Sequence, residues 1–282
     1  MTRLRSATAL CLVLSLVALT GCETTSTTQL DPLAVNGRTG SAPEVGYAGV
    51  MHIADASRTA GDYGNAINLY RHAASMEPSN PEPLVALGDT LLDTGKPDDA
   101  IINYNAALKL SPKYPTALRG LAKSYLKTGR PDLAASPLAV AYTDMPDDPK
   151  LLLLIGVADD FIGQHAHAQN RYRQGLRVAP SDRSLITNLA LSLALSEKFD
   201  QAIDVLRPIA LAPNATPHER QTLALIYGLK GDEKMARELA RRDLDAAATD
   251  HNLAFYDTLR RLPPEARSRA ILSASAATKP QS

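Results

Sequence analysis

The sequence has no tryptophan, three phenylalanines and two cysteines among its 282 residues. So few aromatic side chains argue against a surface that stacks nucleic-acid bases. The 30 basic side chains are balanced by 30 acidic ones, so the chain also lacks the basic surface that binds phosphate backbones. Cys11 and Cys22 alone cannot build a disulfide framework. We therefore expect no nucleic-acid partner and a core held by apolar packing, which a hydrophobic content of 45% supports.

Sequence signatures of catalysis are also missing. The chain contains no H-E-x-x-H, no glycine-rich phosphate loop and no G-x-S-x-G. His165 and His167 are two residues apart, a spacing that does not place them on one helix face. Ser124 to Lys127 matches S-x-x-K and Lys127 to Gly129 matches K-T-G, but both matches share one lysine. The sequence predicts a protein that is not an enzyme and that uses no cofactor and no metal.

Residues 1–21 have the layout of a lipoprotein signal peptide. Two arginines precede the apolar run Ala7–Leu19, which is too short for a transmembrane helix. The ending Leu19-Thr20-Gly21-Cys22 resembles the bacterial lipobox, in which the cysteine sulfur is acylated and cleavage leaves that cysteine first. We therefore predict Cys22 as a lipidation site that anchors the protein in a membrane. A plain signal peptide with an incidental cysteine is the alternative.

The segments at the two ends of the mature chain have little hydrophobic periodicity. Residues 22–46 are rich in Thr, Ser, Gly and Pro, which predicts a lipidated N-terminus followed by a flexible tether. An ordered arm packed on the domain is the alternative for this segment. Residues 278–282 are expected to form a disordered tail.

Residues 47–250 repeat one pattern six times with a period of 34. The registers are 47–80, 81–114, 115–148, 149–182, 183–216 and 217–250. Alanine occupies the twentieth place of every unit: Ala66, Ala100, Ala134, Ala168, Ala202 and Ala236. Glycine occupies the fifteenth place of five units, namely Gly61, Gly95, Gly129, Gly163 and Gly231. In the fifth unit this place is taken by Glu197.

The chemistry of these places predicts two helices in each unit. Small residues let two helices approach closely, and glycine ends the first helix because it accepts a positive φ. The pattern resembles the tetratricopeptide repeat, and Leu87-Gly88, Ala100, Tyr104 and Pro112 carry the resemblance best. The resemblance implies an all-α fold, a right-handed superhelical solenoid of about six repeats.

Residues 251–277 do not continue the repeat. Pro263-Pro264 divides them into two segments, of which the first has apolar residues on roughly one helix face. A solenoid needs a terminal cap because its last repeat has no neighbour. We predict that 251–277 form capping helices. Inside the repeats, Pro137 and Pro208 fall within second helices, where proline disturbs the backbone, so irregular packing is expected there.

In the family that this pattern resembles, the first helix of each unit lines a concave groove. The corresponding places are mainly charged in units one to three, and apolar in units four to six. The candidate partner-binding residues are Leu153, Val157, Phe161, Leu191, Leu195, Leu225, Arg119 and Lys123. Such a groove suits a partner segment such as an amphipathic helix. Two alternatives stay open: the apolar set is core beneath the capping helices, and the charged set is a solvated face.

A lipobox, a Thr-rich tether, six repeats and the stretch Asn252–Arg261 together resemble the TadD-type lipoproteins of tight-adherence (Flp) pilus systems. The resemblance implies an accessory role in pilus biogenesis, assisting assembly or targeting of a secretin. It also implies a place in the cell envelope, lipid-anchored at the outer membrane and facing the periplasm. The partners would be a secretin or another pilus assembly component. An envelope scaffold for cell-wall or exopolysaccharide machinery and an enzyme-activating subunit are the alternatives.

Overall fold

The computed structural model describes residues 45–277. The predicted signal peptide, the lipidation site Cys22, the tether up to Glu44 and the tail 278–282 lie outside the described residues. The described chain forms fourteen α-helices: α1 (Tyr47–Thr59), α2 (Tyr63–Met76), α3 (Glu82–Asp93), α4 (Pro97–Leu110), α5 (Pro115–Lys127), α6 (Pro131–Asp144), α7 (Pro149–Phe161), α8 (His165–Val178), α9 (Arg183–Leu195), α10 (Phe199–Ala210), α11 (Pro217–Lys230), α12 (Glu233–Ala240), α13 (Ala246–Arg261) and α14 (Pro264–Ala277).

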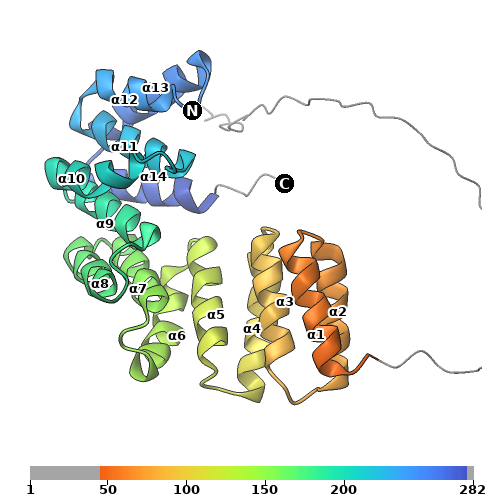
Figure 1. Ribbon diagram of the computed structural model, residues 1–282. Helices are drawn as coiled ribbons and strands as arrows, with labels where there is room; N and C mark the ends of the chain where they lie inside the picture. The colour runs from red at the N-terminus through yellow and green to blue at the C-terminus, as the bar shows by residue number, and fades with distance from the viewer. Residues whose placement is uncertain (1–44, 278–282) are drawn as a thin grey trace, which may run out of the picture. The chain divides into compact units, whose positions relative to one another are not determined.

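The helices pack in consecutive pairs, and each pair lies against the next one (Figure 1). We call the first helix of each pair helix A and the second helix B. Successive A helices from α3 to α11 contact each other and therefore line one side of the stack. This arrangement confirms the predicted all-α solenoid of the tetratricopeptide-repeat type. Within residues 45–277, no helix combines the length and apolar composition needed to cross a lipid bilayer.

The turn between helices A and B has the same left-handed conformation in every unit. The five turn glycines have φ between 69° and 93°, and Glu197 has φ 59° at the remaining turn. Glu197, which lies in the turn of the fifth pair, is the only described residue other than glycine with a positive φ. A side chain in this region costs roughly 1–2 kcal/mol, so another interaction must hold Glu197 there.

The end of the stack departs from the 34-residue spacing. Helix α12 ends at Ala240, and Asp245 caps α13 by accepting a hydrogen bond from the Ala248 backbone N–H at 2.7 Å. Helix α13 thus begins inside the interval 217–250 that the spacing assigns to the sixth unit. After Leu262 and Pro263 the chain reverses, and α14 lies against α5, α7 and α9 as well as α13 (Figure 1).

Both prolines inside helix B segments are accommodated by continuous helices. Helix α6 runs through Pro137, which is buried, and α10 runs through Pro208, which is exposed. Each proline removes one backbone donor from its helix, so one carbonyl in the preceding turn lacks its helical partner. The helices nevertheless keep their places in the stack.

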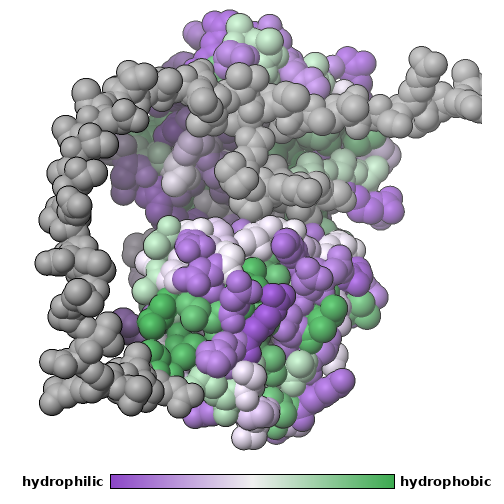
Figure 2. All heavy atoms as spheres, turned by 90° about the vertical axis from the view of Figure 1, so that its right-hand side faces the viewer, coloured by the Kyte–Doolittle hydropathy of each residue, from purple (hydrophilic) through white to green (hydrophobic). Residues whose placement is uncertain are grey.

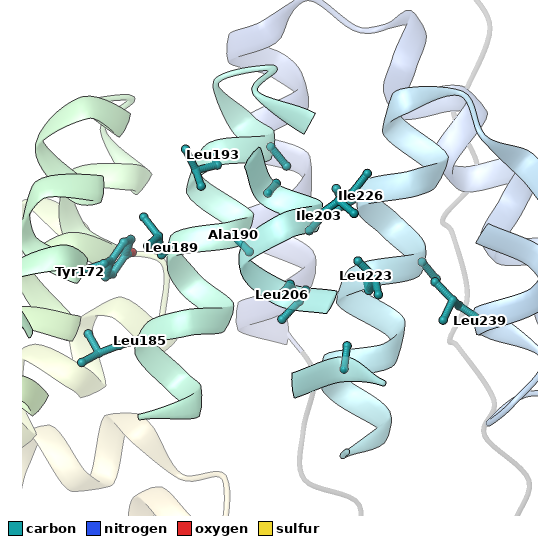
Figure 3. Close-up of a cluster of buried hydrophobic side chains, with 14 of the residues drawn as sticks. Tyr172, Leu185, Leu189, Ala190, Leu193, Ile203, Leu206, Leu223, Ile226 and Leu239 are labelled. Carbon is teal, nitrogen blue, oxygen red and sulfur yellow. The ribbon is translucent and has the colours of Figure 1, made fainter. Parts of the chain in front are cut away.

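Apolar side chains link each pair to its neighbours. In the largest cluster, Tyr172 of α8 and Leu185 of α9 are fully buried, and so are Leu206 of α10 and Leu223 of α11 (Figure 3). The cluster extends to Leu239 of α12, so five successive helices share one core. At the N-terminal end of the stack, the surface mixes hydrophilic and apolar patches (Figure 2), and Val45 and Ile53 are exposed. The stack is therefore held by contacts between neighbours, as expected for a solenoid.

Helices A of two pairs enclose the ring of Tyr104 on α4. The ring is fully buried and lies against the backbone of Gly88 on α3 and Gly120 on α5. A Cβ atom at Gly120 would lie 2.3 Å from ring atoms Cε1 and Cζ of Tyr104. The tyrosine hydroxyl donates a hydrogen bond to Asp89 Oδ1 at 2.5 Å, which prevents the ring from moving aside. Glycine at 120 is thus required by space.

We expect Gly120→Ala to destabilise the fold by about 1–3 kcal/mol, because the added methyl overlaps a ring that is fixed at both ends. The measurement is urea unfolding followed by circular dichroism. Gly64→Ala in α2 is the matched control, since its Cβ would come no closer than 3.9 Å to Asp62 Oδ1. The control should be neutral or stabilising because alanine favours a helix. Equal destabilisation of both variants would contradict the packing argument.

Ion pairs reinforce the contacts between successive A helices. Arg58 of α1 donates to Asp93 of α3 at 2.7 Å, and Arg119 of α5 donates to Asp148, the N-cap of α7, at 2.8 Å. Arg183 of α9 pairs with Glu219 of α11. The hydrogen bonds from Arg183 hold the pKa of Glu219 down at about 2, from an ordinary value of 4.5. Glu219 is buried, and its carboxylate also accepts from the Thr216 backbone N–H at 2.8 Å in a capping box.

We expect the free energy of unfolding to fall as the pH is lowered from about 4.5 towards 2. The reason is that the Glu219 carboxylate stabilises the folded state only while it is ionised, and its pKa is depressed in that state. Glu219→Gln should lose on the order of 2–3 kcal/mol at pH 6 and should show a flatter acid limb. Urea midpoints measured between pH 6 and 2.5 test this. An acid limb as steep in Glu219→Gln as in the wild type would show that other carboxylates cause it.

Candidate docking groove

The predicted apolar groove residues lie beneath α14. Phe161 of α7, Leu191 and Leu195 of α9 and Leu225 of α11 pack in one cluster with Ile271 and Leu272 of α14 and with Leu229, Leu259 and Leu262. Leu195 is 3% exposed, and the other three are partly buried. We call this surface the rear groove. Helix α14 occupies the rear groove in this structure, so the capping helix covers the apolar residues.

Two further predicted residues belong to the inter-repeat packing. Leu153 and Val157 of α7 are partly buried, and Leu153 packs against the cluster that includes Leu185 and Leu189. Val157 also contacts the cluster around Leu118 and Leu138. Leu153 in addition borders the cavity described next.

The charged half of the concave side contains a cavity of about 280 Å³, which we call the front groove. Its lining comes from α1, α3, α5 and α7 and consists of Arg58, Asp89, Asp93, Thr116, Arg119, Gly120, Lys123, Lys150, Leu153 and Leu154. No residue of α14 lines it. Four cations face two carboxylates in this lining, an excess of two positive charges.

The cations of the front groove differ in their pairing. Arg58 and Arg119 are engaged by Asp93 and Asp148, as described above. Lys123 and Lys150 are exposed, and neither has a carboxylate within 4.0 Å among the described residues. The structure thus places Arg119 in a structural ion pair, whereas Lys123, the other predicted charged residue, presents its cation to solvent.

Buried tyrosines hold one carboxylate of helix A in place in each of the first two pairs, and one of these carboxylates, Asp89, lines the front groove. Tyr104 donates to Asp89 at 2.5 Å, and Tyr70 donates to Asp55 at 2.6 Å, each from helix B to helix A of the same pair. Burial is the main reason that the pKa of both tyrosines is raised, and the neighbouring carboxylate raises it further. The hydroxyls therefore stay protonated donors. Asp and Tyr are 15 residues apart in both cases, so their spacing in the sequence could have identified these hydrogen bonds.

A buried polar network surrounds Asp160. Asp160 at the end of α7 is 4% exposed and accepts three hydrogen bonds, from His165 Nδ1 at 2.7 Å, Tyr172 at 2.8 Å and Ser192 at 2.7 Å. His165 Nε2 lies 3.3 Å from Ser268 Oγ on α14. The network links α7, α8, α9 and α14. Nothing in the sequence identifies this network, because Ser192 and Ser268 lie 32 and 103 residues from the groups that they contact.

The order Asp160, His165, Ser268 matches the order of hydrogen bonds in a hydrolase triad, but the surroundings do not support nucleophilic catalysis. Ser268 is 6% exposed and lies inside α14, where backbone N–H groups are used by the helix and form no oxyanion hole. We therefore interpret the network as structural. Within the described residues, no group of three or more His, Cys, Asp or Glu side chains is arranged to hold a metal ion.

We expect Asp160→Asn to lower the free energy of unfolding by about 2 kcal/mol, because an amide NH₂ would face donors that now share one carboxylate. Thermal and urea unfolding provide the measurement. Asp159→Asn on the neighbouring, half-buried residue is the control and should change stability little. Similar losses in both variants would show that the network around Asp160 does not contribute specifically to the free energy of unfolding.

Comparison with known proteins supports the fold. Two family models described as tetratricopeptide repeat match residues 58–102 and 85–149. No curated protein matches the sequence. A solved tetratricopeptide repeat protein from Parabacteroides merdae is 15% identical, with a TM-score of 0.62, and the match covers 77% of this chain and 86% of that one.

Two solved structures of pilus proteins are also similar. PilF of Pseudomonas aeruginosa is 16% identical with a TM-score of 0.60, covering 74% of this chain and 97% of PilF. PilW, described as a widely conserved type IV pilus biogenesis factor, is 16% identical with a TM-score of 0.63, covering 68% of this chain and 90% of PilW. At these identities the likeness shows the fold alone.

Proposed function

We propose that this protein is a lipid-anchored docking scaffold of the bacterial envelope that assists the assembly of a tight-adherence pilus. In this proposal Cys22 carries the lipid, the tether spaces the repeats from the outer membrane, and the front groove holds a segment of a secretin or another assembly component. The observation that carries the proposal is the front groove itself, a cavity of about 280 Å³ with two exposed lysines lacking carboxylate partners.

The chemistry of the front groove favours an acidic partner segment. Lys123 and Lys150 supply the unpaired positive charge, and Leu153 and Leu154 supply an apolar wall beside them. Arg58 and Arg119 are fixed by their own ion pairs, so the groove keeps its shape without a partner. Because Lys123 and Lys150 are exposed, their attraction should speed association and weaken with salt.

Envelope localisation and the pilus role rest on other observations. The lipobox pattern ending at Cys22 supports the anchor, and two acyl chains hold a protein stably in a membrane. The fold likeness to two pilus proteins agrees with the resemblance of the sequence to TadD-type lipoproteins. Tethering the scaffold near its partner raises their effective concentration, so a modest intrinsic affinity suffices.

The test is a crosslinking pull-down from intact envelopes with the full chain. We expect a secretin or pilus assembly protein to be recovered with the wild type. Its recovery should fall about tenfold, equivalent to roughly 1.4 kcal/mol, with Lys123→Glu, because the substitution reverses a charge in the front groove. Lys113→Glu is the matched control, since Lys113 is an exposed loop residue outside the cavity lining.

The outcomes separate the candidate functions. Recovery only of wall synthases or exopolysaccharide proteins would refute the pilus role. Equal recovery with both lysine variants would refute the front groove as the docking site. Failure of Cys22→Ala to release the protein from membranes would refute the lipid anchor.

A further inference from the structure

Helix α14 contacts the rear groove in the manner of a bound ligand. Its apolar contribution comes from Ile271 and Leu272, which are 3% and 7% exposed and pack among Phe161, Leu195 and Leu225. The main repeat clusters contain no residue of α14. Helix α14 therefore joins the stack through one cluster, that of Leu195, Leu229 and Leu259, and it follows a short connection at Leu262 and Pro263.

A specific polar contact fixes the position of α14 in the rear groove. Arg267 is 9% exposed and donates to Glu197 Oε1 at 2.8 Å. It also donates to the carbonyl oxygens of Leu259 and Leu262, each at 3.1 Å. Arg267 lies four residues before Ile271, so these two side chains are on the same side of the helix.

The contact with Arg267 gives a reason for glutamate, in place of glycine, at the turn residue 197. Its backbone has the left-handed conformation that glycine provides in the other five turns. The side chain that replaces glycine receives Arg267 of a helix 70 residues away. The carboxylate of Glu197 thus gives the rear groove an anionic partner for a helix that binds there. A glycine at position 197 would have no side chain to make this contact.

From these contacts we infer that the rear groove is a helix-binding site filled by the chain's own α14, and that a partner helix of the same chemistry displaces it. The partner is an amphipathic helix with one basic residue followed, four and five positions later, by two aliphatic residues. This spacing reproduces Arg267, Ile271 and Leu272. This inference deepens the proposed docking function and rests on it. It assigns a second class of segment to the rear groove, distinct from the acidic segment of the front groove.

The experiment uses a fluorescent peptide with the sequence of residues 263–277 and measures its anisotropy with the full chain. Ile271→Asp in the chain should release α14 and open the rear groove, so the peptide should bind at least about tenfold more tightly than to the wild type. Ala274→Asp is the matched control, because Ala274 is exposed on α14, and peptide binding should equal that of the wild type. Adding Glu197→Gln to Ile271→Asp should weaken the peptide again.

Arg267→Glu provides a second way to release α14, because the new carboxylate faces Glu197, and it must produce the same gain in peptide binding. Circular dichroism checks that the repeats stay helical in each variant. Absence of peptide binding to both opened chains, or equal binding to wild type and opened chains, would overturn the inference. That failure would leave the lysine-dependent pull-down unchanged, so it is distinguishable from failure of the proposed function.

Discussion

Close contact between the two helices of each pair is the constraint on which the rest of the structure depends. The alanine that recurs every 34 residues has no exposed surface in any of the six pairs. A larger side chain at this place would push helix B away from helix A and alter the angle between successive pairs. Because each pair contacts mainly its neighbours, such an error would add up along the stack. The alanines therefore set the curvature that brings the A helices to one side.

A regular stack presents a regular concave side, so its two grooves arise from what the sequence places on the A helices. In the front, charged side chains are partly neutralised between neighbouring pairs, as Arg119 and Asp148 show. In the rear, leucines replace them, and exposed leucines in a row would favour aggregation. Helix α14 removes this risk by covering them. The same residues that could recruit a partner are thus protected while no partner is bound.

The sequence predicted the parts of the fold that depend on short-range spacing. Gly61 and Ala66 lie within one helix pair, and repetition of such local signals is enough to predict six pairs. The position of α14 could not be predicted in the same way, because it depends on contacts such as that of Arg267 with Glu197. The missing glycine at 197 was visible in the sequence, but nothing there identified its partner. Likewise, the role of Asp160 depends on Ser192, and that of His165 on Ser268, and these partners approach only in the folded chain.

Arginine and the aliphatic pair of α14 contribute differently to its binding. Ile271 and Leu272 gain free energy from burial, but apolar contacts tolerate a shift along the groove. The buried guanidinium of Arg267 does not tolerate such a shift. Its N–H groups would lose their hydrogen bonds to Glu197 and to the carbonyl oxygens of Leu259 and Leu262. Affinity is therefore supplied by the aliphatic residues and register by the arginine. A helix that carried only the aliphatic pair would bind the rear groove in several positions, and only one with the basic residue correctly spaced would reproduce the position of α14.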